Sequence, residues 1–130
     1  MDEEIYKENI LDHNRNPHNR EVLDEYDLRG GGTNPTCGDE LELFVKLGED
    51  GKVTHATFLG SGCAISQAGA SMLTDKLKGL PGQGMTLAGL KLLAPGDIYS
   101  MLGIHISPGR VNCALLAYRA LNDGLKNAKA

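Results

Sequence analysis

Two alternating segments joined by a short turn constrain the fold of this chain more than any other feature. Residues 40–47 (ELELFVKL) alternate apolar with charged side chains, and residues 52–60 (KVTHATFLG) alternate again. A period of two is typical of half-buried β-strands, whose successive side chains point to opposite faces. The GEDG between the two segments has the composition of a tight turn. The sequence therefore predicts an antiparallel hairpin.

Helical patterns fill most of the remaining sequence. Apolar residues recur at helical spacing in several segments, and glycine or proline interrupts the chain between them. Because the strands precede most of the helices, we predict an α+β fold: an antiparallel β-sheet of about three strands covered by helices on one face, with an N-terminal helix and a long C-terminal helix. The predicted helices span residues 2–14, 63–79, 86–93, 97–103 and 111–127.

The third strand is expected just upstream of the hairpin, at residues 23–29. The glycine run at residues 30–32 predicts a mobile loop, because glycine is conformationally permissive. No linker, internal repeat or low-complexity stretch divides the 130 residues. One domain over residues 1–130 is therefore expected.

Composition excludes several classes of function. The formal net charge is −4 and the basic residues are scattered, so nucleic-acid binding has no support. No apolar run approaches the ~18 residues that a membrane span needs. The start of the chain, MDEEIYKEN, lacks the basic and apolar regions of a secretory signal. These features predict a cytoplasmic protein.

The three cysteines, Cys37, Cys63 and Cys113, are odd in number and cannot all form disulfides within the chain. Each lies at the edge of a predicted element. The hairpin brings the start of its first strand near the end of its second, so Cys37 and Cys63 are predicted neighbours. Cys63 opens the predicted helix 63–79, and Cys113 falls in the first turn of the last predicted helix. A helix N-terminus favours the thiolate, so we expect this effect at both sulfurs. We expect all three sulfurs to converge at one exposed rim.

Asp39 completes a four-ligand set with the three sulfurs. It lies two residues after Cys37, and residues i and i+2 of an extended segment point to the same side. Three thiolates together repel one another unless a cation neutralises them. Zn²⁺, or iron in an iron–sulfur cluster, accepts three sulfurs and one oxygen. Because glycine flanks the ligands and no C-x-x-C pair is present, reversible binding is favoured over a rigid structural site.

The histidines in the described patterns are expected to serve packing instead. His13 is assigned to the packing of the N-terminal helix and His55 to the hairpin, and neither is expected to be a metal ligand.

Four segments resemble one known family. NPTCGD, GSGCAIS and PGRVNCALLAYRAL contain the three cysteines, and ILDHNRNPHN near the N-terminus makes a fourth match. In this order they are similar to the iron–sulfur cluster assembly scaffolds, the group of IscU, SufU and the NifU N-terminal domain. The resemblance covers nearly the whole chain and implies the SufE/NifU-like fold.

Within that family the chain looks closer to SufU than to IscU. IscU-like proteins carry a histidine directly before the third cysteine, where this chain has Asn112. ISPGRV stands in place of their Leu-Pro-Pro-Val-Lys segment, which recruits a chaperone. Arg110 and the motif CAIS, which begins at Cys63, resemble the SufU-like sequences. SufU-like proteins bind zinc through three cysteines and one aspartate, and accept sulfur from a cysteine desulfurase.

The resemblance implies a role in iron–sulfur cluster biogenesis, with Cys37, Asp39, Cys63 and Cys113 as ligands of Zn²⁺ or of a transient [2Fe–2S] cluster. A cysteine desulfurase of the SufS, IscS or NifS kind would deliver sulfur to Cys37, or alternatively to Cys113. Arg110 would assist by a hydrogen bond to Asp39 or to a sulfur. A downstream iron–sulfur carrier or apo-protein would receive the [2Fe–2S] or [4Fe–4S] product.

Two alternatives stay open beside the scaffold. One is a zinc-dependent sulfurtransferase that does not itself hold a cluster, and the other is a structural zinc module for binding proteins. The sequence does not decide whether the chain is an enzyme, because the same ligands suit both ions.

Overall fold

The computed structural model describes residues 2–34, 38–80, 82–103, 106 and 108–127. Its elements follow the predicted order, with one strand and one helix placed differently. The helices are α1 (Asp2–Arg15), α2 (Ala64–Lys78), α3 (Leu87–Leu92), α4 (Pro95–Leu102), α5 (Val111–Ala114) and α6 (Leu116–Asn127), with a 3₁₀ turn η1 (Pro108–Arg110). The strands are β1 (Leu28–Asn34), β2 (Asp39–Leu47) and β3 (Val53–Ser61).

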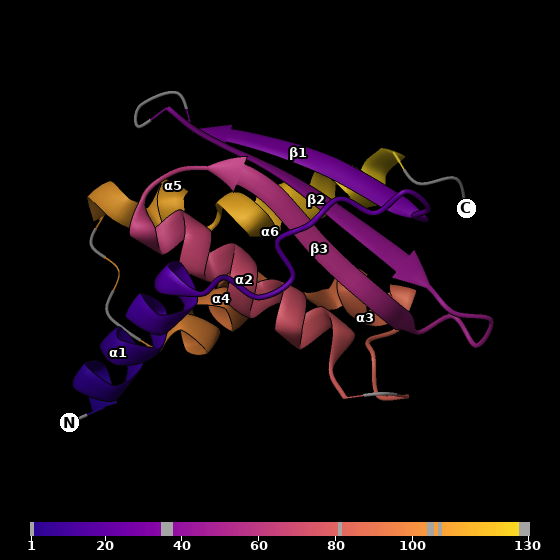
Figure 1. The fold of residues 1–130 in the computed structure, drawn as a ribbon, viewed down its shortest axis with the longest axis horizontal. Coiled ribbons are helices and arrows are strands. Elements are labelled where there is room, and N and C mark those ends of the chain that lie inside the picture. The colour runs from indigo at the N-terminus through magenta and orange to yellow at the C-terminus, as the bar shows by residue number, and fades with distance from the viewer. Residues whose placement is uncertain (1, 35–37, 81, 104–105, 107, 128–130) are drawn as a thin grey trace.

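The sheet has the order β1-β2-β3, and both strand pairs are antiparallel. The helices gather on one face of it, with α6 against β1 and β2, and α2 against β3 (Figure 1). The helix α1 packs on α2 and extends away from the sheet (Figure 1). The α+β prediction, with helices on one face of an antiparallel sheet, is confirmed.

Apolar side chains of the hairpin build the core toward the helices. Leu41, Leu43 and Val45 of β2 are buried, and so is Phe58 of β3. Phe44 points the other way, yet it is also buried because Tyr26 and Arg29 cover its ring, at 5.5 and 5.7 Å from its centre. The outer face of the sheet is therefore partly shielded, which the alternation did not predict.

The glycine run was wrongly expected to be a loop. Gly30, Gly31 and Gly32 lie within β1, and the third strand spans Leu28–Asn34 instead of residues 23–29. A Cβ atom at Gly30 would come within 1.9 Å of the carbonyl oxygen of Ala120 in α6. The glycines are there because the backbone of α6 lies directly on the strand.

The last helix was predicted as one piece and is two. A break at Leu115 separates the single turn α5 from α6, and Leu115 still donates its N–H to the carbonyl of Val111 at 3.0 Å. The break falls two residues after Cys113. That cysteine therefore lies in a one-turn helix and not at the N-terminus of a long one.

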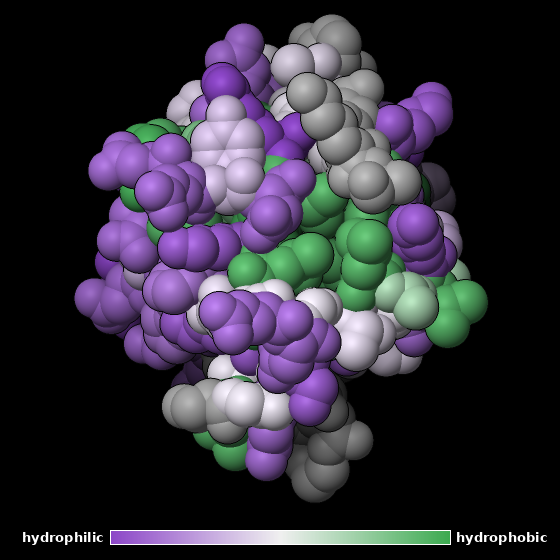
Figure 2. Space-filling view, turned by 90° about the vertical axis from the view of Figure 1, so that its right-hand side faces the viewer, coloured by the Kyte–Doolittle hydropathy of each residue, from purple (hydrophilic) through white to green (hydrophobic). Residues whose placement is uncertain are grey.

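The side of the molecule on which α3 lies carries a gathering of apolar surface between polar margins (Figure 2). Leu92 of α3 is 81% exposed. In the described part of the chain, no helix is both long and apolar enough to cross a membrane.

Candidate metal centre

Three of the four predicted ligands converge. Asp39 is the first residue of β2, Cys63 is the N-cap of α2, and Cys113 lies in α5. One ligand atom from each, the carboxylate oxygen and the two sulfurs, lies within 4.8 Å of the others. The hairpin makes this possible because Glu40, beside Asp39, pairs with Ser61 at the end of β3. The chain then turns directly into α2.

Hydrogen bonds hold the carboxylate of Asp39 in place. Ser66, one turn into α2, donates its hydroxyl to Asp39 Oδ2 at 2.6 Å. The backbone N–H of Cys63 donates to Oδ1 at 3.3 Å. Ser66 Oγ also lies 3.2 Å from the Cys63 sulfur. The N-terminus of α2 thus organises both the oxygen and one sulfur of the site.

Gly62 is needed for this close approach. A Cβ atom there would lie 2.8 Å from Cγ of Asp39 and 3.0 Å from Oγ of Ser66. Any side chain would push the start of α2 away from the carboxylate. The site needs glycine before Cys63 because there is no room for a side chain. It does not need glycine for an unusual backbone conformation, because the φ of Gly62 is not positive.

Cys113 approaches from the other side of the site. Its side chain is 1% exposed, and Asn34 at the end of β1 donates its amide Nδ2–H to the sulfur at 3.6 Å. A buried, hydrogen-bonded sulfur is held in one position. Because α5 is a single turn, the helix-dipole effect predicted for two sulfurs applies only to Cys63, at the start of the 15-residue α2.

The exposed rim that we expected is only partly present. Asp39 and Cys113 are buried at 3% and 1% exposure, and Cys63 is half-buried. Solvent and reagents therefore meet the described part of the site at Cys63. The other two groups are shielded from bulk water.

The surroundings of Cys63 lower the pKa of its thiol. Burial raises its pKa, but hydrogen bonds from the side chain and backbone of Ser66, from Cys113 and from the backbone of Ile65 outweigh that effect. The pKa of Cys63 consequently lies below its ordinary value. A depressed pKa makes the thiolate, the form that binds metals and attacks sulfur, more abundant near neutral pH.

Cys37 and Arg110 are the two remaining predicted site residues. Cys37 lies outside the described residues, so its place at the site stays a prediction. Arg110 is exposed, and no hydrogen bond or ion pair joins it to Asp39 among the described residues. Two residues that the sequence analysis did not single out, Asn34 and Ser66, contact the site. Of these, Ser66 had a signal, since it lies one helical turn after Cys63.

The donor set fits a soft or borderline cation. Two sulfurs and one carboxylate oxygen at this separation need small side-chain movements to reach bond lengths of about 2.0–2.3 Å. The oxygen is a harder ligand than the sulfurs, so it holds such a cation less firmly. Zn²⁺ and the iron of an iron–sulfur cluster both suit these residues.

The chain matches the family model described as the NifU-like N terminal domain over residues 5–130. It is 36% identical to the zinc-dependent sulfurtransferase SufU of Bacillus subtilis, covering 93% of this chain and 89% of that one. It is 32% identical to the iron–sulfur cluster assembly scaffold protein IscU of Streptococcus pyogenes, covering 95% and 84%.

Solved structures agree with the sequence matches. The crystal structure of FiSufU from Fervidobacterium islandicum, a candidate iron–sulfur cluster assembly scaffold protein for the SUF system, superposes with a TM-score of 0.72. The two chains are 25% identical, and the match covers 96% of this chain and 99% of the other. The arrangement of helices on one face of a three-stranded sheet is thus shared with that structure.

Proposed function

The chain belongs to the NifU-like N-terminal domain family, and we propose that it works in iron–sulfur cluster biogenesis. In this role it accepts sulfur from a cysteine desulfurase, then assembles or relays that sulfur for [2Fe–2S] or [4Fe–4S] formation. The observation that carries the proposal is the convergence of Asp39, Cys63 and Cys113 within 4.8 Å. Relatives that are named as scaffolds and as a zinc-dependent sulfurtransferase support it.

We assign Cys37 as the fourth ligand and the first sulfur acceptor. Asn34 and Asp39 pair across β1 and β2, and the N–H of Gly38 donates to the carbonyl of Asn34 at 2.8 Å. Both Asn34 and Asp39 border the site. The short connection between them limits how far Cys37 can lie from it, since each residue spans at most ~3.6 Å.

The sulfur transfer is a thiol exchange. The thiolate of Cys37 attacks the terminal sulfur of the desulfurase persulfide, and a new S–S bond forms while the old one breaks. The desulfurase cysteine leaves as a thiolate, so the transfer needs no external oxidant or reductant. Cys113 is the alternative acceptor, but its burial and its bond from Asn34 make it the slower one.

Zn²⁺ is the resident ion that we propose for the purified chain. Cys37, Asp39, Cys63 and Cys113 would hold it, and it would keep the thiolates together and protected from oxidation. The iron–sulfur cluster is the cargo. The half-buried sulfur of Cys63 and the harder oxygen of Asp39 are the points at which a bound cluster is most easily released.

Two versions of the function differ in what the site carries. In the scaffold, a [2Fe–2S] cluster is built on the chain and passed to a carrier or an apo-protein. In the sulfurtransferase, only sulfur passes through, and the zinc-bound chain never holds a cluster. The 36% identity to the B. subtilis sulfurtransferase favours the second version. We place either version in the cytoplasm, where the thiols stay reduced.

The experiment measures zinc, iron and acid-labile sulfide in the purified chain, then adds a cysteine desulfurase with cysteine. One zinc per chain together with faster desulfurase turnover supports the sulfurtransferase. A coloured, transferable cluster after addition of iron supports the scaffold. If chelation unfolds the chain and neither effect is seen, the structural zinc module is correct and our proposal is wrong.

Two variants test the residue assignments. Cys37→Ser is expected to abolish stimulation of the desulfurase, and full stimulation would remove Cys37 as the acceptor. Asp39→Ala is expected to retain an assembled cluster longer than the parent chain, because the weaker oxygen ligand has gone. Equal cluster lifetimes would count against the releasing role of Asp39.

A further inference from the structure

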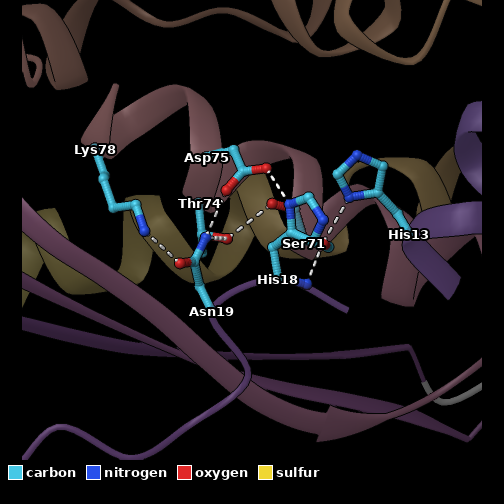
Figure 3. Close-up of polar contacts among 7 residues, drawn as sticks. All are labelled: His13, His18, Asn19, Ser71, Thr74, Asp75 and Lys78. Carbon is cyan, nitrogen blue, oxygen red and sulfur yellow. Dashed lines mark hydrogen bonds and ion pairs between the residues drawn. The ribbon is translucent and has the colours of Figure 1, made fainter. Parts of the chain in front are cut away.

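A second group of metal-binding side chains lies between α1 and α2, away from the thiols. His13 belongs to α1, His18 follows it, and Asp75 lies in the last turns of α2. One ligand atom from each lies within 4.8 Å of the others. The centres of the two imidazole rings are 4.5 Å apart, with the ring planes tilted by 49°, and the carboxylate lies beside the ring of His18 (Figure 3).

We propose that His13, His18 and Asp75 form a binding site for a borderline divalent cation such as Zn²⁺, Co²⁺ or Ni²⁺. Two imidazole nitrogens and one carboxylate oxygen are ligands that these ions accept, with water in the remaining positions. Ligands bonded to zinc at about 2.0–2.2 Å lie roughly 3.3 Å apart. The largest separation of 4.8 Å closes to that value by small rotations of the two accessible side chains.

The side chains around the site hold its ligands in place (Figure 3). Ser71 Oγ lies 2.7 Å from Nδ1 of His13 and accepts the backbone N–H of His18 at 2.8 Å. Asn19 donates its amide to Oδ1 of Asp75 at 2.8 Å. Lys78 in turn donates to the amide oxygen of Asn19 at 2.7 Å. Supports of this kind orient metal ligands and strengthen their affinity.

The carboxylate keeps one oxygen for the ion. Asn19 occupies Oδ1, so Oδ2 of Asp75 is the atom that faces the histidines. At present Oδ2 accepts a hydrogen bond from Nδ1 of His18 at 2.5 Å. A bound cation would replace this hydrogen bond with one bond to the imidazole of His18 and one to the carboxylate of Asp75. Asn19 has a φ of 60°, a backbone conformation that turns the chain so that residues 18 and 19 both reach α2.

Burial and charge also suit a cation. His13 is buried, while the side chains of His18 and Asp75 are 46% and 39% exposed, which leaves an open approach from solvent. Burial and the neighbouring His18 lower the pKa of His13, so its ring is neutral at neutral pH, as a metal ligand must be. Asp75 supplies negative charge, and Asp12 adds to it.

The ligand types distinguish this site from the thiol site. It offers imidazole nitrogens and a carboxylate oxygen, whereas the other site offers thiol sulfurs and a carboxylate oxygen, and zinc accepts both sets. A bound ion would tie the exit of α1 to α2 and so stabilise the packing of the N-terminal helix. The inference does not depend on the proposed function, because none of its residues belongs to the thiol site.

The test counts Zn²⁺ bound to the full, reduced chain after equilibrium dialysis, with cysteine alkylation as a separate measure of the thiol site. The parent chain is expected to bind two ions. His18→Gln and Asp75→Asn, both at accessible side chains, are expected to bind one and to keep their thiols protected. His55→Gln, at an exposed histidine on β3, is the matched control and is expected to bind two.

Several results would overturn the inference. A single ion in the parent chain whose thiols are protected would do so, as would a second ion that persists in both His18→Gln and Asp75→Asn. Loss of the second ion in the His55→Gln control would also refute it. If the thiols stay reactive while one ion binds through His18, the proposed function fails and this site stands.

Asn19→Gly tests the supporting amide separately. Glycine tolerates the φ of 60° at this position, so the backbone is preserved while the side-chain hydrogen bonds that join Asn19 to Asp75, Thr74 and Lys78 are lost. We expect the affinity of the second ion to fall by about 10–100-fold. An unchanged affinity would show that Asn19 does not orient the ligand.

Discussion

Removing the hydroxyl of Ser66 should disturb both the stability and the chemistry of the thiol site. The hydroxyl donates to the buried carboxylate of Asp39 at 2.6 Å and lies 3.2 Å from the sulfur of Cys63. In Ser66→Ala, Oδ2 of Asp39 loses this donor, while Oδ1 keeps only the longer bond from the backbone of Cys63. No other side chain among the described residues donates to Oδ2.

The size of the effect follows from the burial of the carboxylate. A hydrogen bond to a charged group contributes about 1.5–3 kcal/mol, and leaving a buried acceptor unpaired costs a similar amount. Asp39 is only 3% exposed, so water does not replace the lost donor. We therefore expect the free energy of unfolding of the reduced, metal-free chain to fall by about 2 kcal/mol. Denaturant unfolding at neutral pH measures it, with Ser61→Ala, at an exposed position nearby, as the control.

The same variant should raise the pKa of Cys63. Hydrogen bonds from the side chain and backbone of Ser66 are among the effects that hold this pKa below its ordinary value, against the effect of burial. Without the side-chain bond, the pH dependence of Cys63 alkylation should move to higher pH. Mass spectrometry of the modified peptide separates Cys63 from the other cysteines.

Two results would each refute one part of the reasoning about Ser66. An unfolding free energy for Ser66→Ala that equals that of Ser61→Ala would mean that the contact between Ser66 and Asp39 does not stabilise the fold. An unchanged pH profile for alkylation of Cys63 would mean that the hydroxyl of Ser66 does not lower the pKa of that thiol.

Three further predictions test other parts of the structure. Gly30→Ala should lower the free energy of unfolding by about 3 kcal/mol or more, because its Cβ would meet backbone atoms of α6 that cannot move aside. The control Gly31→Ala should change the free energy of unfolding by less than about 1 kcal/mol. Equal effects of the two variants in thermal unfolding would contradict the packing of β1 against α6. His13, whose pKa in the folded chain is lowered by burial and by His18, binds its proton less readily than in the unfolded chain, so its contribution to stability should be complete above about pH 6.5 and be lost as the pH falls through its folded pKa. Urea titrations across this range should show the loss in the parent chain and a flatter dependence in His13→Gln. Gly62→Ala should weaken Zn²⁺ binding at the thiols by at least about tenfold, because the methyl group displaces Asp39. Competition with a chelator measures this affinity. An unaltered affinity would mean that the close approach of Gly62 to Asp39 does not matter for metal binding.

Local patterns determined the hairpin and most of the helices, because alternation and helical spacing are properties of neighbouring residues. The helix predicted at residues 63–79 is observed as Ala64–Lys78, and the strand predicted at 40–47 as Asp39–Leu47. The same patterns placed Asp39 and Cys63 at the ends of adjacent elements. Their closeness followed from the hairpin alone.

Contacts between distant segments decided the rest. The sequence by itself treats three glycines in a row as a loop, and only the backbone of α6 lying on Gly30 makes them part of a strand. Ser66 belongs to the thiol site because α2 starts beside Asp39. His13 lies near Asp75 because α1 packs on α2. A chain can specify which groups it carries from local spacing, but which of them touch depends on how its elements pack.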